Sequence, residues 1–156
     1  MHKTLWPSGL LLNFHNLAIA ILSLLLLAGS TLGGVAQSVY EPPRGSAERR
    51  EILDAVRPMV EARVGPPVEF VVGWMRSGAG WAFVNVNPQR PGGGKIDPFL
   101  TTFASQAEYM DGLSTYALLR YQYSRWNLVD FVVGPTDVFW QGDPLYAQVP
   151  LGLTPY

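Results

Sequence analysis

Apolar residues recur three or four positions apart between Ser46 and Gly65, which is the spacing of one face of an α-helix. Ser46 is a suitable N-cap, and Gly65 is a suitable residue for the helix end just before Pro66. Pro58 lies inside the pattern and has no backbone N–H, so it is expected to bend the helix or to split it near Arg57. The apolar positions of this stripe are Ile52, Leu53, Val56, Met59, Val60 and Val64.

Beyond Pro67 the sequence changes to runs of β-branched and aromatic residues, which are typical of strands. The first pair of runs covers 68–75 and 81–86 around a glycine-rich turn, and it predicts a hairpin. The second pair covers 113–121 and 126–133, with a turn at 122–125 that contains no glycine. Because two-residue turns favour glycine, the tightness of this second hairpin is an open question.

The order of these elements predicts an α+β fold in which an N-terminal helix packs on a curved antiparallel sheet of about four strands. The domain is expected to span 46–142 and to be followed by an irregular tail over 143–156. Asn85 and Asn87 alternate with Trp81 and Phe83, so that face of the second strand is expected to be partly wet. Thr136 or Asp137 is expected to cap a short helical turn that carries Val138, Phe139 and Trp140.

The first 36 residues have the layout of a secretory signal peptide. Lys3 precedes the apolar run Leu17–Ala28, and small residues follow up to Ala36. A run of this length is too short to cross a bilayer comfortably. We therefore expect cleavage near Ala36, a signal helix over 1–36, a linker over 37–45, and a periplasmic or secreted protein. The alternative is an uncleaved membrane anchor formed by residues 10–28.

Composition excludes several kinds of chemistry. The chain has no Cys, and both of its His lie within the expected signal peptide. The mature domain would therefore lack thiolate and histidine nucleophile mechanisms and the usual zinc ligands. The formal net charge of −1, which becomes −2 once Lys3 is removed with residues 1–36, gives no electrostatic case for nucleic-acid binding. No cofactor is expected, and any catalysis would depend on carboxylates, Lys, Tyr, Ser or an oxygen-ligated metal.

Asp130 is the most notable carboxylate because it lies in the middle of an apolar strand. The expected explanation is solvent exposure or an ion pair with Arg76, Arg120 or Arg125. A carboxylate-dependent enzyme would need a second acid within a shared cleft. Glu69 or Asp137 are the weak candidates for that role, although Asp137 also suits a helix cap.

A binding surface is the other possibility. Aromatic side chains give large contact area at low entropic cost, and basic side chains add charge. The glycine-rich loop Gly92–Lys95 lacks the Ser or Thr and the spaced glycine of a phosphate-binding loop, so a flexible connector is the simpler interpretation. The loop and the two hairpins would contribute the candidate ligand-binding residues Trp81, Arg90, Lys95, Tyr123 and Arg125.

Four segments within 46–142 look like those of small exported bacterial proteins of uncharacterised function. They are Trp81–Val84, Arg90–Gly93, Ala117–Arg120 and Gly134–Trp140. The predicted arrangement also resembles the cystatin-like and NTF2-like folds. The resemblance implies a helix cradled by a curved sheet and gives no catalytic residues to carry over.

Two functions remain open after this reasoning. The first is an exported, non-enzymatic binding module for a protein, a peptide or a glycan, with a homodimer also open. The second is a small carboxylate-dependent hydrolase or isomerase with a pocket between helix and sheet. A pocket with convergent carboxylates would favour the enzyme, and a flat face with exposed aromatic rings would favour the binder. Contact with a membrane is expected only if the N-terminal helix stays uncleaved.

Overall fold

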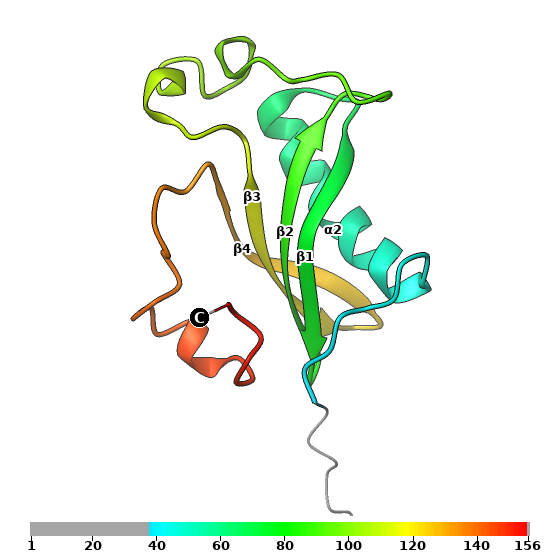
Figure 1. Cartoon of the computed structure of the whole chain (residues 1–156). Coiled ribbons are helices and arrows are strands. Elements are labelled where there is room, and N and C mark those ends of the chain that lie inside the picture. Colours follow the sequence, from blue (N-terminus) through cyan, green and yellow to red (C-terminus); the bar gives the residue numbers. More distant parts are fainter. Residues whose placement is uncertain (1–37, 156) are drawn as a thin grey trace, which may run out of the picture. The chain divides into compact units, whose positions relative to one another are not determined.

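The structure is a computed structural model that describes residues 38–155. The expected signal peptide or membrane anchor lies outside these residues. Helix α2 (Ala47–Val64) is followed by strands β1 (Glu69–Gly78), β2 (Trp81–Gln89), β3 (Thr115–Gln122) and β4 (Arg125–Val133). The strands form one antiparallel sheet in the order β1-β2-β3-β4 (Figure 1). The predicted α+β class, with one helix packed on a four-stranded antiparallel sheet, is confirmed.

Helix α2 begins and ends at the residues that the sequence predicts. The Ser46 side chain accepts a hydrogen bond from the backbone N–H of Arg49, and the N–H of Gly65 donates to the carbonyl of Glu61. Pro58 does not split the helix, which runs unbroken from Ala47 to Val64. The side chain of Pro58 is exposed, so its missing N–H lies on the solvent side while the opposite side remains anchored in the core.

The first core lies between α2 and one face of the sheet. The helix contributes one buried residue per turn, and the three inner positions Ile52, Val56 and Val60 are almost fully buried. They pack against alternating residues of β2 and β3, including Val84 and Leu119. This layer follows from the period of the sequence, because residues with helical spacing face residues with strand spacing.

The second face of the sheet is covered as well, by the C-terminal segment (residues 134–155). Figure 1 shows this segment and α2 on opposite sides of the sheet. Trp140, Tyr146 and Leu153 are buried against Phe83 of β2 and Leu118 of β3. The segment contains a 3-10 turn at Tyr146–Gln148 and is otherwise irregular, and it belongs to the folded domain beyond residue 142.

This second layer corrects two expectations. Phe83 and Asn85 were expected on a partly wet face, but both are buried, and only Asn87 is exposed. The amide of Asn85 donates to the hydroxyl of Ser114 at 2.8 Å. The expected helical turn at 136–140 is an ordinary turn, in which the N–H of Gln141 donates to the carbonyl of Val138. The rings of Phe139 and Trp140 in this turn are held by aromatic packing rather than by helix formation.

The turn of the second hairpin is tight although it contains no glycine. Gln122 pairs with Arg125, so Tyr123 and Ser124 alone form the loop. Both residues have positive φ, at 54° and 60°, as a type I′ turn requires. The pairing of the flanking strands imposes this conformation on side chains that seldom adopt it.

Asp130 and Tyr146 connect the C-terminal segment to β4. The Tyr146 hydroxyl donates to the Asp130 carboxylate at 2.9 Å, and the other carboxylate oxygen accepts from the N–H of Phe131. Asp130 has no ion pair within residues 38–155, so the expected partner arginines are replaced by a tyrosine. Burial, followed by the hydrogen bond to Asp130, raises the pKa of Tyr146.

The raised pKa of Tyr146 predicts a loss of stability in alkali. Below pH 10 the tyrosine is protonated in both the folded and the unfolded chain. Above that pH the unfolded chain releases the proton while the folded chain keeps it, so the free energy of unfolding falls. The slope from this one group is at most about 1.4 kcal/mol per pH unit. Urea titrations between pH 8 and 11 measure this slope. Above pH 10 the free energy of unfolding of the Tyr146→Phe variant should fall less steeply than that of the wild-type protein. Equal slopes in both proteins would contradict the assignment.

Candidate functional site

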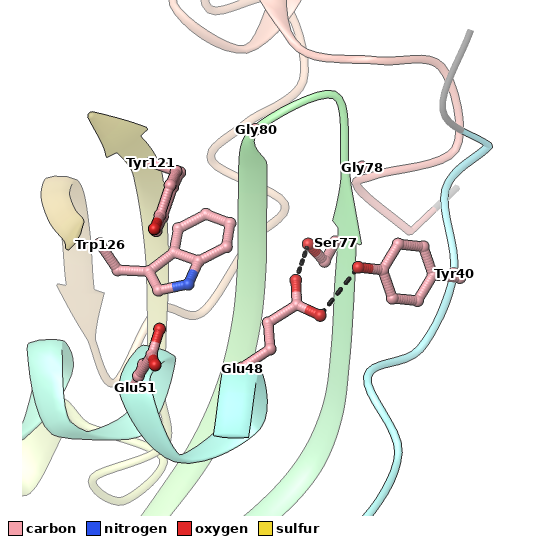
Figure 2. A pocket seen from close by; sticks show the side chains of 8 residues that line it. All are labelled: Tyr40, Glu48, Glu51, Ser77, Gly78, Gly80, Tyr121 and Trp126. Carbon is pink, nitrogen blue, oxygen red and sulfur yellow. Dashed lines mark hydrogen bonds between the residues drawn. The ribbon is translucent and has the colours of Figure 1, made fainter. Parts of the chain in front are cut away.

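A pocket of about 380 Å³ lies between the first turns of α2 and the sheet, where the turn of the first hairpin meets the tip of the second (Figure 2). We call it the helix–sheet pocket. Its residues come from the segment before α2, from α2 itself, from strands β1, β3 and β4, and from the turn between β1 and β2. They are Tyr40, Glu48, Glu51, Ser77, Gly78, Gly80, Tyr121 and Trp126.

Glu48 is the centre of the polar side of this pocket. One carboxylate oxygen accepts a hydrogen bond from the Ser77 hydroxyl at 2.6 Å, and the other accepts from the Tyr40 hydroxyl at 2.8 Å (Figure 2). The hydrogen bond to Glu48, with some burial, raises the pKa of Tyr40, so its hydroxyl remains a donor at neutral pH. Glu48 thereby holds the preceding segment and β1 against the helix.

The segment before α2 is docked on the domain and positions Tyr40. The backbones of Tyr40 and Ser77 exchange two hydrogen bonds, of 2.9 and 2.8 Å, so Tyr40 extends the edge of the sheet beside β1. The buried guanidinium of Arg49 donates to the carbonyl of Pro42 at 2.9 Å. Gly78 allows this close approach, because a Cβ there would lie 3.0 Å from the Val39 side chain.

Trp126 and Tyr121 form the aromatic wall opposite Glu48. They are a cross-strand pair of β3 and β4, with ring centroids 5.2 Å apart in an edge-to-face arrangement. Trp126 as a whole residue is only 8% exposed, and its indole N–H makes no hydrogen bond within residues 38–155. No buried side-chain nitrogen or oxygen in this part of the chain lacks a partner, so the N–H is an accessible donor at the pocket rather than a buried, unsatisfied one. In Figure 2 its nitrogen faces the space between the two glutamates.

Glu51 is the second acid of the pocket and lies one helical turn after Glu48. Within the described part of the chain, its carboxylate takes part in neither an ion pair nor a side-chain hydrogen bond. The lining of the pocket contains no Lys or Arg. The pocket therefore combines an unpaired negative charge, a free N–H donor and aromatic rings.

A larger hollow, of about 840 Å³, lies beside β1 between the start of the described chain and the C-terminal segment. Its one cationic side chain, Arg76, already donates to the carbonyl of Gly152. Its acid, Glu41, is 3.3 Å from Arg49. Because the charged groups here are already occupied, this hollow offers less to a ligand than the helix–sheet pocket does.

The three acids that the sequence singled out do not share a cleft. Glu69 is exposed at the start of β1, and Asp130 lies on β4, at the opposite edge of the sheet. Three strand spacings separate these edges by roughly 14 Å. Asp137 is exposed in the segment after β4 and does not cap a helix.

The five candidate ligand-binding residues lie at two ends of the sheet. Trp81, Tyr123 and Arg125 are at the end that carries both hairpin turns, next to the helix–sheet pocket. Tyr123 is 90% exposed, and the Trp81 ring is covered by the guanidinium of Arg120, 4.7 Å from its centroid. Arg90 and Lys95 follow β2 at the other end.

Arg90 has a structural role. Its guanidinium donates to the carbonyls of Val64, at 2.8 Å, and of Gly65 and Pro67. These groups belong to the end of α2, where carbonyls lack partners within the helix. Lys95 is exposed in the glycine-rich loop, which closes on itself through the bridge between Arg90 and Gly94.

Sequence reasoning missed most of the helix–sheet pocket. Tyr40 was assigned to a linker, and Glu48 and Glu51 belong to the polar side of an amphipathic helix, where acids are usually only solvated. One signal was present in the sequence. Glu48, Glu51 and Asp54 recur every third residue, so they lie along one side of α2.

Among residues 38–155 no group of His, Cys, Asp and Glu is arranged to hold a metal ion. In the same part of the chain, no helix has the length and apolar character to span a membrane. No family model matches the chain, and no curated protein or solved structure is significantly similar to it.

Proposed function

We propose that this protein is an exported, non-enzymatic binding module that takes part of a protein, peptide or glycan ligand into the helix–sheet pocket. One observation carries the proposal: an accessible indole N–H, on Trp126, and an exposed, unpaired carboxylate, on Glu51, face the same pocket. Neither group has a partner among residues 38–155, so both are free to bind a ligand.

Export rests on the N-terminal sequence. The order of Lys3, the apolar run Leu17–Ala28 and the small residues up to Ala36 favours a cleaved signal peptide and a periplasmic or secreted domain. Retention of residues 10–28 would instead tether the same domain to a membrane. The helix-first order and the four-stranded antiparallel sheet also support a cystatin-like or NTF2-like arrangement.

The test is recovery of the protein from the periplasm or medium of expressing cells, followed by intact mass and identification of any molecule that co-purifies. The expected mass corresponds to a start near Gln37. A defined molecule should be retained by the wild-type protein and by Glu108→Gln, which removes an exposed acid outside the pocket lining. Trp126→Phe and Glu51→Gln should lose it. Failure of the wild-type protein to retain any molecule that these variants lose would refute the proposal.

The alternative is a small carboxylate-dependent hydrolase or isomerase. The position of the pocket between helix and sheet and the 2.6 Å contact from Ser77 to Glu48 favour it. Against it, Ser77 is only 3% exposed. A nucleophile must reach its substrate, so binding is the better-supported function.

A further inference from the structure

A second hollow lies beside the helix–sheet pocket along α2. That hollow, of about 310 Å³, is lined by Asp54, Ala55, Ser124 and Arg125, and it shares Glu51 and Trp126 with the pocket. The two hollows together form a groove between the first half of α2 and the tip of the β3–β4 hairpin. We call it the α2–hairpin groove. A groove of this form suits an extended chain better than a single small molecule.

The helix side of the groove carries a row of negative charge. Glu48, Glu51 and Asp54 are each three residues apart, which is a rise of about 4.5 Å per step along the helix. Glu48 is held by Tyr40 and Ser77, and Asp54 is 3.8 Å from Arg57 in an exposed pair that contributes little. Glu51, in the middle, is the acid left without a partner in the described chain.

The chemistry of the pocket selects among possible occupants. The two carboxylates of the pocket, those of Glu48 and Glu51, favour a cation, because opposite charges attract. The free indole N–H of Trp126 can donate to an acceptor beside that cation. A metal ion or a simple amine brings no acceptor, and a neutral sugar brings no charge. A lysine or arginine residue within a peptide brings both, through its side chain and its own carbonyl.

We infer that the ligand of the α2–hairpin groove is an extended basic segment of another protein. One of its Lys or Arg side chains enters the helix–sheet pocket against Glu48 and Glu51. The carbonyl of the same residue accepts from the indole N–H of Trp126, and the segment continues past Asp54. This inference rests on the proposed binding function and adds the chemical class of the ligand.

The test is a titration of the ¹⁵N-labelled protein, as cells produce it, with end-capped peptides of alternating alanine and lysine. Matched peptides carry glutamine or glutamate in place of lysine, and chitotriose represents a neutral glycan. The readout is the indole N–H signal of Trp126, assigned by its loss in Trp126→Phe. The lysine peptide should shift this signal in a saturable manner, and added salt should weaken its binding.

Two acid variants provide a matched pair. Glu51→Gln should weaken binding of the lysine peptide about fivefold, as expected for the loss of one partly exposed charge pair. Glu108→Gln removes the same charge from an exposed position outside both hollows and should leave binding unchanged.

Each contrary outcome overturns the inference in a recognisable way. Equal binding of the lysine and glutamine peptides would show that charge is not recognised. A shift caused by chitotriose and not by the lysine peptide would identify a glycan site. Both of these results would leave the proposed binding function standing. If no probe moves the Trp126 signal, the basic-peptide ligand is refuted, and the co-purification experiment decides on the binding function separately.

Discussion

Truncation of the chain after Gly142, where the sequence places the end of the domain, is expected to destabilise the fold by about 4 kcal/mol or more. The cut removes the buried side chains of Tyr146 and Leu153 and uncovers Phe83 on the second face of the sheet. It also removes the hydrogen bond from Tyr146 to Asp130. Thermal and urea unfolding of the truncated protein measure the loss. A truncated protein as stable as the full chain would show that the C-terminal segment does not belong to the core.

Two leucines in this segment test whether the loss of stability comes from buried side chains, without shortening the chain. Leu153 is fully buried and Leu151 is 92% exposed, although only one residue lies between them. Leu153→Ala should lower the free energy of unfolding by about 2–5 kcal/mol, because it leaves a cavity. Leu151→Ala should change it by less than about 0.5 kcal/mol. Similar losses in the two variants would contradict the packing described here.

Phe83→Ala is expected to cost about 3–5 kcal/mol of stability. Phe83 is fully buried, and its ring packs edge-to-face on Trp74, Trp140 and Tyr146, with centroids 5.2 to 5.5 Å apart. It joins β1, β2 and the C-terminal segment, so its removal should loosen all three. Urea unfolding followed by near-UV circular dichroism measures both the stability and the loss of aromatic order.

Phe99→Ala is the matched control for this prediction. Phe99 is 55% exposed in the loop after β2, outside both buried clusters, and the same substitution there should have a small effect. A large loss in Phe99→Ala, or a small one in Phe83→Ala, would mean that the second layer does not depend on the ring of Phe83.

The candidate site shows how far the sequence could lead. It indicated a pocket between helix and sheet for one of the two functions, but it chose Asp130 with Glu69 or Asp137 as the acids. The position of a residue along its strand does not show where that strand lies in the sheet. Glu69 and Asp130 lie on the two opposite edge strands. The acids that border the helix–sheet pocket come from α2, where their helical spacing looked like an ordinary solvated face.

The C-terminal segment escaped prediction for a related reason. Trp140, Tyr146 and Leu153 have neither helical nor strand spacing, so no local pattern marks them as core. The continuous apolar runs of β2 and β3, such as Trp81–Val84, did indicate that both faces of the sheet are covered, because a strand buried on both faces has no polar side. The turn at Tyr123 and Ser124 is similar, since only the pairing of Gln122 with Arg125 imposes its conformation.

The sequence by itself determined the helix, its two ends, the two hairpins and the α+β class, because these depend on periodicity and capping over a few residues. Only the tertiary structure decided what covers the second face of the sheet and which side chains meet in the helix–sheet pocket. Tyr40, Glu48, Ser77 and Trp126 come from four separate parts of the chain. Their meeting depends on strand register and on the docking of irregular segments, which no local pattern encodes.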